Sequence, residues 1–173
     1  MESTLSDICK EKAVSLGLCD QWQQEWEDNS SKEVLIEKYL RGIDFCLKHN
    51  YPSVDFIKEK FGETINSFGI YADENALIVN RQMSVLLGDT NARVLMQGIV
   101  GEIYVRHQSV LELVASNNAK VWVNTLDFTT VRIWCDETSK VFLHNYGDAK
   151  IEIHGENISI KERKGFFGES KTR

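Results

Sequence analysis

Hydrophobic and polar residues alternate through the C-terminal part of the chain, and the alternation restarts at short, regular intervals. Between residues 119 and 158 a small or slightly polar residue precedes an aliphatic–any–aliphatic triplet every ten residues, as in AKVWV, TTVRI, SKVFL and AKIEI. A two-residue period over so short a stretch is typical of a β-strand with one buried face. Segments rich in turn-forming residues, such as GDTN, ASNN and NYGD, separate the triplets. The pattern predicts an internal repeat of one short strand and one tight corner.

About ten such strands are expected from residue 76 onward. Their first inward-facing aliphatic residues are predicted to be Leu77, Val85, Val94, Ile103, Leu111, Val121, Val131, Val141, Ile151 and Ile158. Two architectures can use this repeat. In a β-solenoid each strand stacks in parallel on the strand one coil earlier, whereas in an antiparallel sandwich or barrel sequence neighbours pair. The near-constant unit length, the small residue before each triplet and the lack of Asn-Gly or Asp-Gly hairpin turns favour the solenoid.

The first 62 residues show helical spacing instead. Thr4 and Asp7 can form a capping box at the start of a first helix, and Ser53 can cap a last one, VDFIKEKF. Between them, an apolar stripe predicts one helix that starts after Ser30 or Ser31 and ends near Asn50. We therefore expect an α+β protein in which residues 1–68 form a helical cap, residues 69–162 a β-solenoid, and residues 163–173 a flexible basic tail.

The segment CDQWQQEWED predicts one more short helix in the N-terminal region. It places Trp22 and Trp26 four residues apart, and residues at this spacing lie on one face of a helix. Two large rings on one face are candidates for a contact surface.

The residue between each pair of inward aliphatic residues is expected to point outward. In chain order these residues are Leu86, Leu95, Tyr104, Glu112, Trp122, Arg132, Phe142 and Glu152. A solenoid with two strands per coil would sort them onto opposite faces. One face would carry a row of Leu86, Tyr104, Trp122 and Phe142, and the other a ladder of Glu112, Arg132 and Glu152.

A row of large apolar side chains in water usually marks a contact surface. Three interpretations remain open at this point: the N-terminal helices cover the row, the row mediates self-association or binding of a protein partner, or Tyr104, Trp122 and Phe142 stack against carbohydrate. The candidate interaction surface therefore consists of Leu86, Tyr104, Trp122, Phe142, Trp22 and Trp26.

Composition and motifs point away from catalysis. The net charge of −6 is unfavourable for contacts with phosphates, so nucleic acid is not an expected partner. The four cysteines lack C-x-x-C spacing, and the four histidines are scattered, so we expect no metal, cofactor or catalytic residue. The charged N-terminus does not resemble a secretory signal and no apolar stretch is long enough to cross a membrane, so a cytoplasmic location is expected.

The helical lead-in WQQEWEDNSSKEVLIEKYLRGIDFCLKHNYPSVDFIKEKF and the short A-K-V-x-V or S-K-V-x-L units resemble small uncharacterised short-repeat proteins of gut Bacteroidales-type bacteria and of their phages and mobile elements. More distantly, the repeats resemble bactofilins, which are filament-forming β-solenoids. Gly101 alone precedes an aliphatic pair here, so the glycine-rich strand pattern of that family is missing. The resemblance implies no catalytic residue.

Together these features predict a non-enzymatic interaction or assembly protein, with an accessory role in a phage or mobile element implied by the resemblance. The alternative function is a carbohydrate-binding module or a minor glycan-active enzyme of the β-helix type.

Overall fold

The computed structural model describes residues 3–163. The described chain divides into two compact units, a helical unit up to Phe68 and a strand unit from Gly69 onward. The predicted basic tail lies outside the described residues, apart from Arg163.

The helical unit contains α1 (Leu5–Ser15), α2 (Asp20–Gln24), α3 (Lys32–Arg41), α4 (Ile43–Lys48), α5 (Val54–Phe61) and α6 (Thr64–Ser67). The predicted caps are present. The backbone N–H groups of Asp7, Val34 and Phe56 donate to the hydroxyls of Thr4, Ser31 and Ser53.

Three details of the helical unit differ from the sequence-based expectation. The long third helix is in fact two helices, because Gly42 leaves helical geometry (φ −101°, ψ 28°) between α3 and α4. Helix α2 ends at Gln24, so Trp26 lies beyond it. The four-residue α6 was not predicted.

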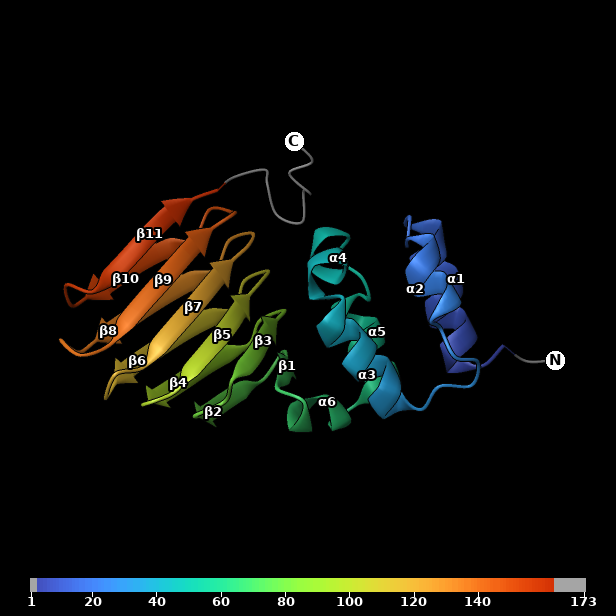
Figure 1. Cartoon of the computed structure of the whole chain (residues 1–173), viewed down its shortest axis with the longest axis horizontal. Coiled ribbons are helices and arrows are strands. Elements are labelled where there is room, and N and C mark those ends of the chain that lie inside the picture. Colours follow the sequence, from blue (N-terminus) through green and yellow to red (C-terminus); the bar gives the residue numbers. More distant parts are fainter. Residues whose placement is uncertain (1–2, 164–173) are drawn as a thin grey trace. The chain divides into compact units, whose positions relative to one another are not determined.

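The strand unit is a β-solenoid with two strands per coil. Sheet A consists of β1 (Ile70–Ala72), β3 (Met83–Leu87), β5 (Val100–Val105), β7 (Lys120–Thr125), β9 (Lys140–Asn145) and β11 (Ile158–Glu162). Sheet B consists of β2 (Asn75–Val79), β4 (Asn91–Gln97), β6 (Val110–Ser116), β8 (Thr130–Cys135) and β10 (Lys150–His154). Every pairing is parallel and joins strands two units apart along the chain (Figure 1). The solenoid prediction is confirmed, and the antiparallel alternative is wrong for the described strands.

The core of the solenoid lies between the two sheets. Sheet A contributes Ile103, Val123 and Leu143 from three successive coils, and each is fully buried. Val94, Leu113 and Ile133 of sheet B are equally buried. Burial of such a side chain stabilises the fold by roughly 1.5–3 kcal/mol. Aligned aliphatic columns therefore supply most of the stability of this narrow fold.

Five corners each bury one small residue. Thr90, Ser109, Ala119, Thr129 and Ser139 all have 0% exposed area, so these small residues occupy crowded bends, whereas Ala149 near the last coil is half-buried. Residues with positive φ precede them, including His107, Asn117, Asn118 and Asp127. Asparagine and aspartate tolerate this left-handed conformation better than most residues.

The predicted phase is wrong in the first two repeat units. Leu77 points outward and is 68% exposed, whereas Ile78 is buried in the core. In β3 it is Leu86 that aligns with inward-facing Val105, so Val85 points outward. ALIV is an uninterrupted apolar run, so a two-residue period cannot assign its faces. In SVLL the polar Ser84 is buried at an inward position, aligned with Ile103, so the apolar pattern indicates the wrong face.

Candidate functional site

Two predicted aromatic residues form a stacked pair on the outer face of sheet A. Trp122 and Phe142 align in register, and their ring centroids lie 5.2 Å apart with planes inclined by 20°. Both side chains are half-buried. Glu102 precedes Trp122 in this column, and Ser159 follows Phe142.

The predicted row of four bulky residues is wrong beyond this pair. Leu86 lies in the core, with no exposed area. Tyr104 points outward but aligns with Val85 and Asn124 in a neighbouring column, and it is 6% exposed. The two residues therefore do not extend the Trp122–Phe142 stack.

Gly101 explains why Tyr104 was assigned to the wrong outward column. The unit that matches Val121–Trp122–Val123 is Gly101–Glu102–Ile103, so the first inward position of β5 holds glycine rather than an aliphatic residue. A Cβ atom at Gly101 would collide with the terminal methyl of Met96. Met96 fills the space that valine occupies in later coils, and the aliphatic pattern therefore shifts by two residues.

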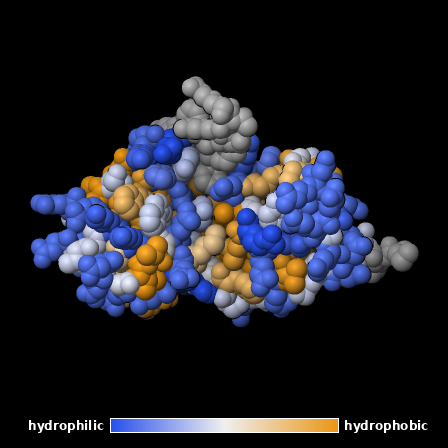
Figure 2. Space-filling model, in the orientation of Figure 1, coloured by the Kyte–Doolittle hydropathy of each residue, from blue (hydrophilic) through white to orange (hydrophobic). Residues whose placement is uncertain are grey.

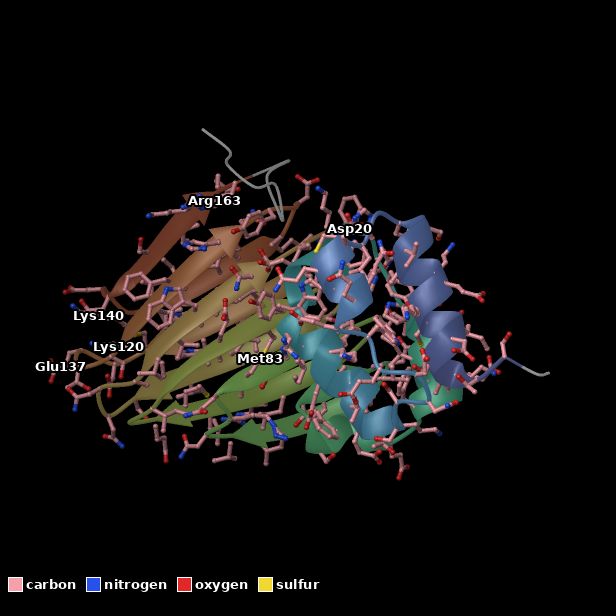
Figure 3. All side chains as sticks on the ribbon, turned by 45° about the vertical axis from the view of Figure 1, so that its right-hand side comes forward. Asp20, Met83, Lys120, Glu137, Lys140 and Arg163 are labelled. Carbon is pink, nitrogen blue, oxygen red and sulfur yellow. The ribbon has the colours of Figure 1, made fainter. Side chains whose placement is uncertain are left out.

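Two lysines flank the aromatic stack. Lys120 and Lys140 begin β7 and β9, align with each other, and are exposed. Figure 3 shows them close together near Glu137, which belongs to the corner between β8 and β9.

On the side of the solenoid turned toward the viewer in Figure 2, hydrophobic residues form separate patches among hydrophilic ones.

The charged ladder predicted on the opposite face is present on sheet B. Glu112, Arg132 and Glu152 align in consecutive strands. Arg132 Nη1 lies 3.3 Å from Glu112 Oε1, and Arg132 Nε lies 3.7 Å from Glu152 Oε2. The register adds Arg93 ahead of Glu112, so the charges alternate over four strands. All of these side chains remain partly or fully exposed, and such ion pairs contribute little individually.

An apolar column that was not predicted runs beside this ladder. It contains Val79, Leu95, Val114 and Trp134, and His154 continues it. Val79 is 55% exposed and Trp134 37%, while Leu95 and Val114 are half-buried. The Trp134 and His154 rings stack 5.1 Å apart and nearly parallel. Leu95 was among the residues predicted to point outward, but Val114 and Trp134 follow the inward pair of their strands and were not predicted to lie beside it.

The two predicted tryptophans of the helical unit each pack under a cation. The Arg41 guanidinium lies 5.1 Å from the Trp22 ring centroid, and Lys38 Nζ lies 5.5 Å from that of Trp26. Trp26 Nε1 also donates to the Ser6 hydroxyl. Both half-buried rings thus contribute to packing inside this unit.

Burial shifts the pKa of several ionisable groups in the described part of the chain. Burial raises the pKa of Cys9, and that of Cys46 to about 12, so both thiols are protonated at neutral pH. Burial lowers the pKa of His107, whose Nδ1 accepts from the backbone N–H of Gly88 at a corner. Among residues 3–163, no group of three or more His, Cys, Asp or Glu residues is arranged to hold a metal ion.

Comparison with known proteins gave no relative. The chain matches no protein-family model, no curated protein and no solved structure. Within the described residues, none of the helices has the length and apolar character needed to span a bilayer.

Proposed function

We propose that this chain is a non-enzymatic interaction or assembly protein that binds another protein through an outer face of its solenoid. The main observation in support is the outer face of sheet B. An exposed apolar column from Val79 to Trp134 lies there beside a column of alternating charges from Arg93 to Glu152.

The two columns together have the composition of a contact surface. They lie two residues apart along each strand, so their side chains are on the same face and roughly 7 Å apart. Protein interfaces combine an apolar centre with charged residues at the rim. A contact that covered Val79 and Trp134 would remove apolar area from water, and the adjacent charges would select the orientation of the partner.

The resemblance of the helical lead-in and the short repeats to proteins of gut bacteria and their phages supports an accessory role inside a cell. A regular solenoid suits such a role because each coil packs only on its neighbours and holds outward side chains at fixed spacing.

Site-specific photo-crosslinking in cells that make the protein tests this proposal. A benzophenone amino acid at position 114, in the apolar column of sheet B, should give an adduct with a protein. The same amino acid at exposed position 137, in a corner, is the matched control and should give far less. Equal or absent adducts at both positions would refute a protein contact on this face, and the adduct mass distinguishes a second copy from another protein.

The stacked pair on sheet A supports one second candidate, carbohydrate binding. Two nearly parallel rings, flanked by Lys120 and Lys140, can form a platform for a sugar ring. If this function holds, a glycan array should show hits that Trp122→Ala abolishes and that Trp134→Ala leaves unchanged. An array without hits would exclude it for the glycans displayed.

A further inference from the structure

We propose that the partner of the sheet B face is a second copy of this chain, packed face to face with its coils in reverse order. This inference rests on the proposed function and specifies the partner. It is carried by the order of charges in one column, which reads Arg93, Glu112, Arg132, Glu152 along four consecutive strands of the sheet.

An alternating column of four charges is complementary to itself when it is reversed. In a two-fold dimer whose axis lies in the interface, parallel to the strands, β4 of one copy faces β10 of the other and β6 faces β8. Arg93 then lies opposite Glu152 of the partner subunit, and Glu112 lies opposite Arg132 of the partner subunit. The two-fold axis repeats both contacts, so all eight charges of the two columns face an opposite charge.

Other arrangements of the same two faces pair fewer of the charges or none. When the two-fold axis runs along the solenoid, the coils keep their order and each charge faces its own copy. A sideways shift places the charged column against an uncharged one. A reversal about β6 as the central strand sets Arg93 against Arg132 of the partner subunit, and like charges repel there. A reversal centred between β4 and β6 pairs Arg93 with Glu112 of the partner subunit but sets Arg132 against Leu77 of the partner subunit. Only the reversal centred between β6 and β8 sets all four charges of each column against an opposite charge.

From Leu95 to His154 the apolar column agrees with that register, and Val79 of β2 lies outside the four paired strands. The column lies two residues further along each strand, and an axis parallel to the strands keeps the column opposite itself. Val114 then faces Trp134 of the partner subunit, and Leu95 faces His154 of the partner subunit. The exposed part of Trp134 would be covered by an aliphatic side chain, which favours association.

The charges are available for contacts with a second copy. The Glu112 and Arg132 side chains are 38% and 40% exposed, and the Glu152 side chain is 57% exposed. Within the chain, Arg132 lies 3.3 Å from the Glu112 carboxylate and 3.7 Å from that of Glu152. Such loose, solvated pairs can turn toward a partner at small cost.

The area of the face indicates weak association. Four strands about 4.8 Å apart and roughly seven residues of about 3.3 Å each cover roughly 400 Å² per copy. A standard interface buries about 800 Å² per partner. We therefore expect a reversible dimer with a dissociation constant in the micromolar range or weaker.

Analytical ultracentrifugation of the full chain, from micromolar to near-millimolar concentration, tests the inference. The unmodified protein should show a monomer–dimer equilibrium that weakens in high salt. Arg132→Glu and Glu112→Arg each place two like-charge contacts in the dimer, so each variant alone should associate roughly tenfold more weakly. An equimolar mixture of the two variants again pairs all charges oppositely and should recover the dimer.

The mixture separates loss of contact from loss of folding, because misfolded variants would not recover on mixing. Lys140→Glu, a charge reversal on sheet A, is the matched control and should leave the equilibrium unchanged. A monomer at every concentration, or no recovery in the mixture, would overturn the inference. If position 114 nevertheless crosslinked to a different protein, the proposed function would stand without it.

Discussion

The middle coils and the last coil of the solenoid carry the same pattern but bury it differently. Ile133 in β8 and Ile153 in β10 occupy the same inward column, yet Ile133 is fully buried and Ile153 is 42% exposed. On sheet A, Leu143 in β9 is fully buried and Ile160 in β11 is 40% exposed. The amino-acid pattern determines which way a side chain points, and the next coil determines whether it is covered.

Pointing inward and being buried are therefore separate properties of a side chain in a repeat fold. Each coil is covered by neighbours on two sides, except at an end.

The largest difference is expected between two matched truncations in one column. Ile133→Ala should lower the free energy of unfolding by about 2–5 kcal/mol, because it opens a cavity between fully packed coils. Ile153→Ala removes the same atoms from a site that water already reaches, and we expect a loss of about 1 kcal/mol. Urea unfolding of both variants measures the contrast. Equal losses would show that the last coil is covered as completely as the middle ones.

A smaller loss is expected where the column begins with glycine. Gly101→Ala adds a methyl group that meets Met96, and we expect a destabilisation of about 1–3 kcal/mol from overpacking. Combining Gly101→Ala with Met96→Ala should recover part of that loss, because the shorter side chain vacates the space. If the double variant lost as much unfolding free energy as the two single variants together, Met96 would not be what fills the space at Gly101.

A further loss of stability is expected at the corner residue Asp136, whose side chain links two successive coils. Its carboxylate accepts from the backbone N–H of Asn117 in the previous coil, from the Thr138 hydroxyl, and from the N–H groups of Thr138 and Ser139. These hydrogen bonds, the one from Asn117 foremost, lower its pKa from 3.8 to about 2. The lowered pKa means that the stabilisation is complete above pH 4 and disappears as the pH falls toward 2.

Asp136→Ala should therefore lower the melting temperature at pH 7 by a few degrees. The difference from the unmodified protein should shrink as the pH falls below 4. Thermal unfolding at several pH values checks this, with the neighbouring exposed Glu137→Ala as a control that should change little at any pH. If the difference in melting temperature between Asp136→Ala and the unmodified protein stayed constant with pH, lost packing would explain the effect instead.

The smallest effect is expected at the corner residue Thr129. Its hydroxyl is buried without a hydrogen-bond partner, unlike that of Ser109, which donates to the Gly88 carbonyl at the equivalent corner of the previous coil. Thr129→Val should be neutral or slightly stabilising, because it removes an unsatisfied polar group at nearly constant volume. Ser109→Ala should instead cost about 1 kcal/mol in unfolding free energy. The opposite order would indicate that the Thr129 hydroxyl has a partner.

Much of the fold was predictable because the sequence repeat is regular in the coils whose core is regularly packed. The near-constant spacing from Val121 to Ile151 favoured the solenoid, and the Glu112–Arg132–Glu152 ladder was predicted for a solenoid with two strands per coil, which the structure has. The prediction failed where apolar residues do not alternate with polar ones in step with the inward and outward positions. In SVLL an inward position holds the polar Ser84, and at Gly101 the inward position has no side chain at all.

The candidate surface was less predictable than the fold. The stack of Trp122 on Phe142 was expected, whereas Leu86 and Tyr104 moved out of the row once the register of β3 and β5 was known. The apolar column through Val114 and Trp134 was missed because its residues follow the inward pair instead of separating it.

The amino-acid sequence alone indicated the local periods and the corner residues, because these depend on side chains within a few residues of one another, and it favoured stacked coils over antiparallel pairs. The three-dimensional fold established the parallel pairing, the outward side chains that share a column and the inward ones that are covered. These properties depend on how a strand aligns with another some twenty residues away, and a shift of one or two residues in that alignment changes every neighbour of a side chain.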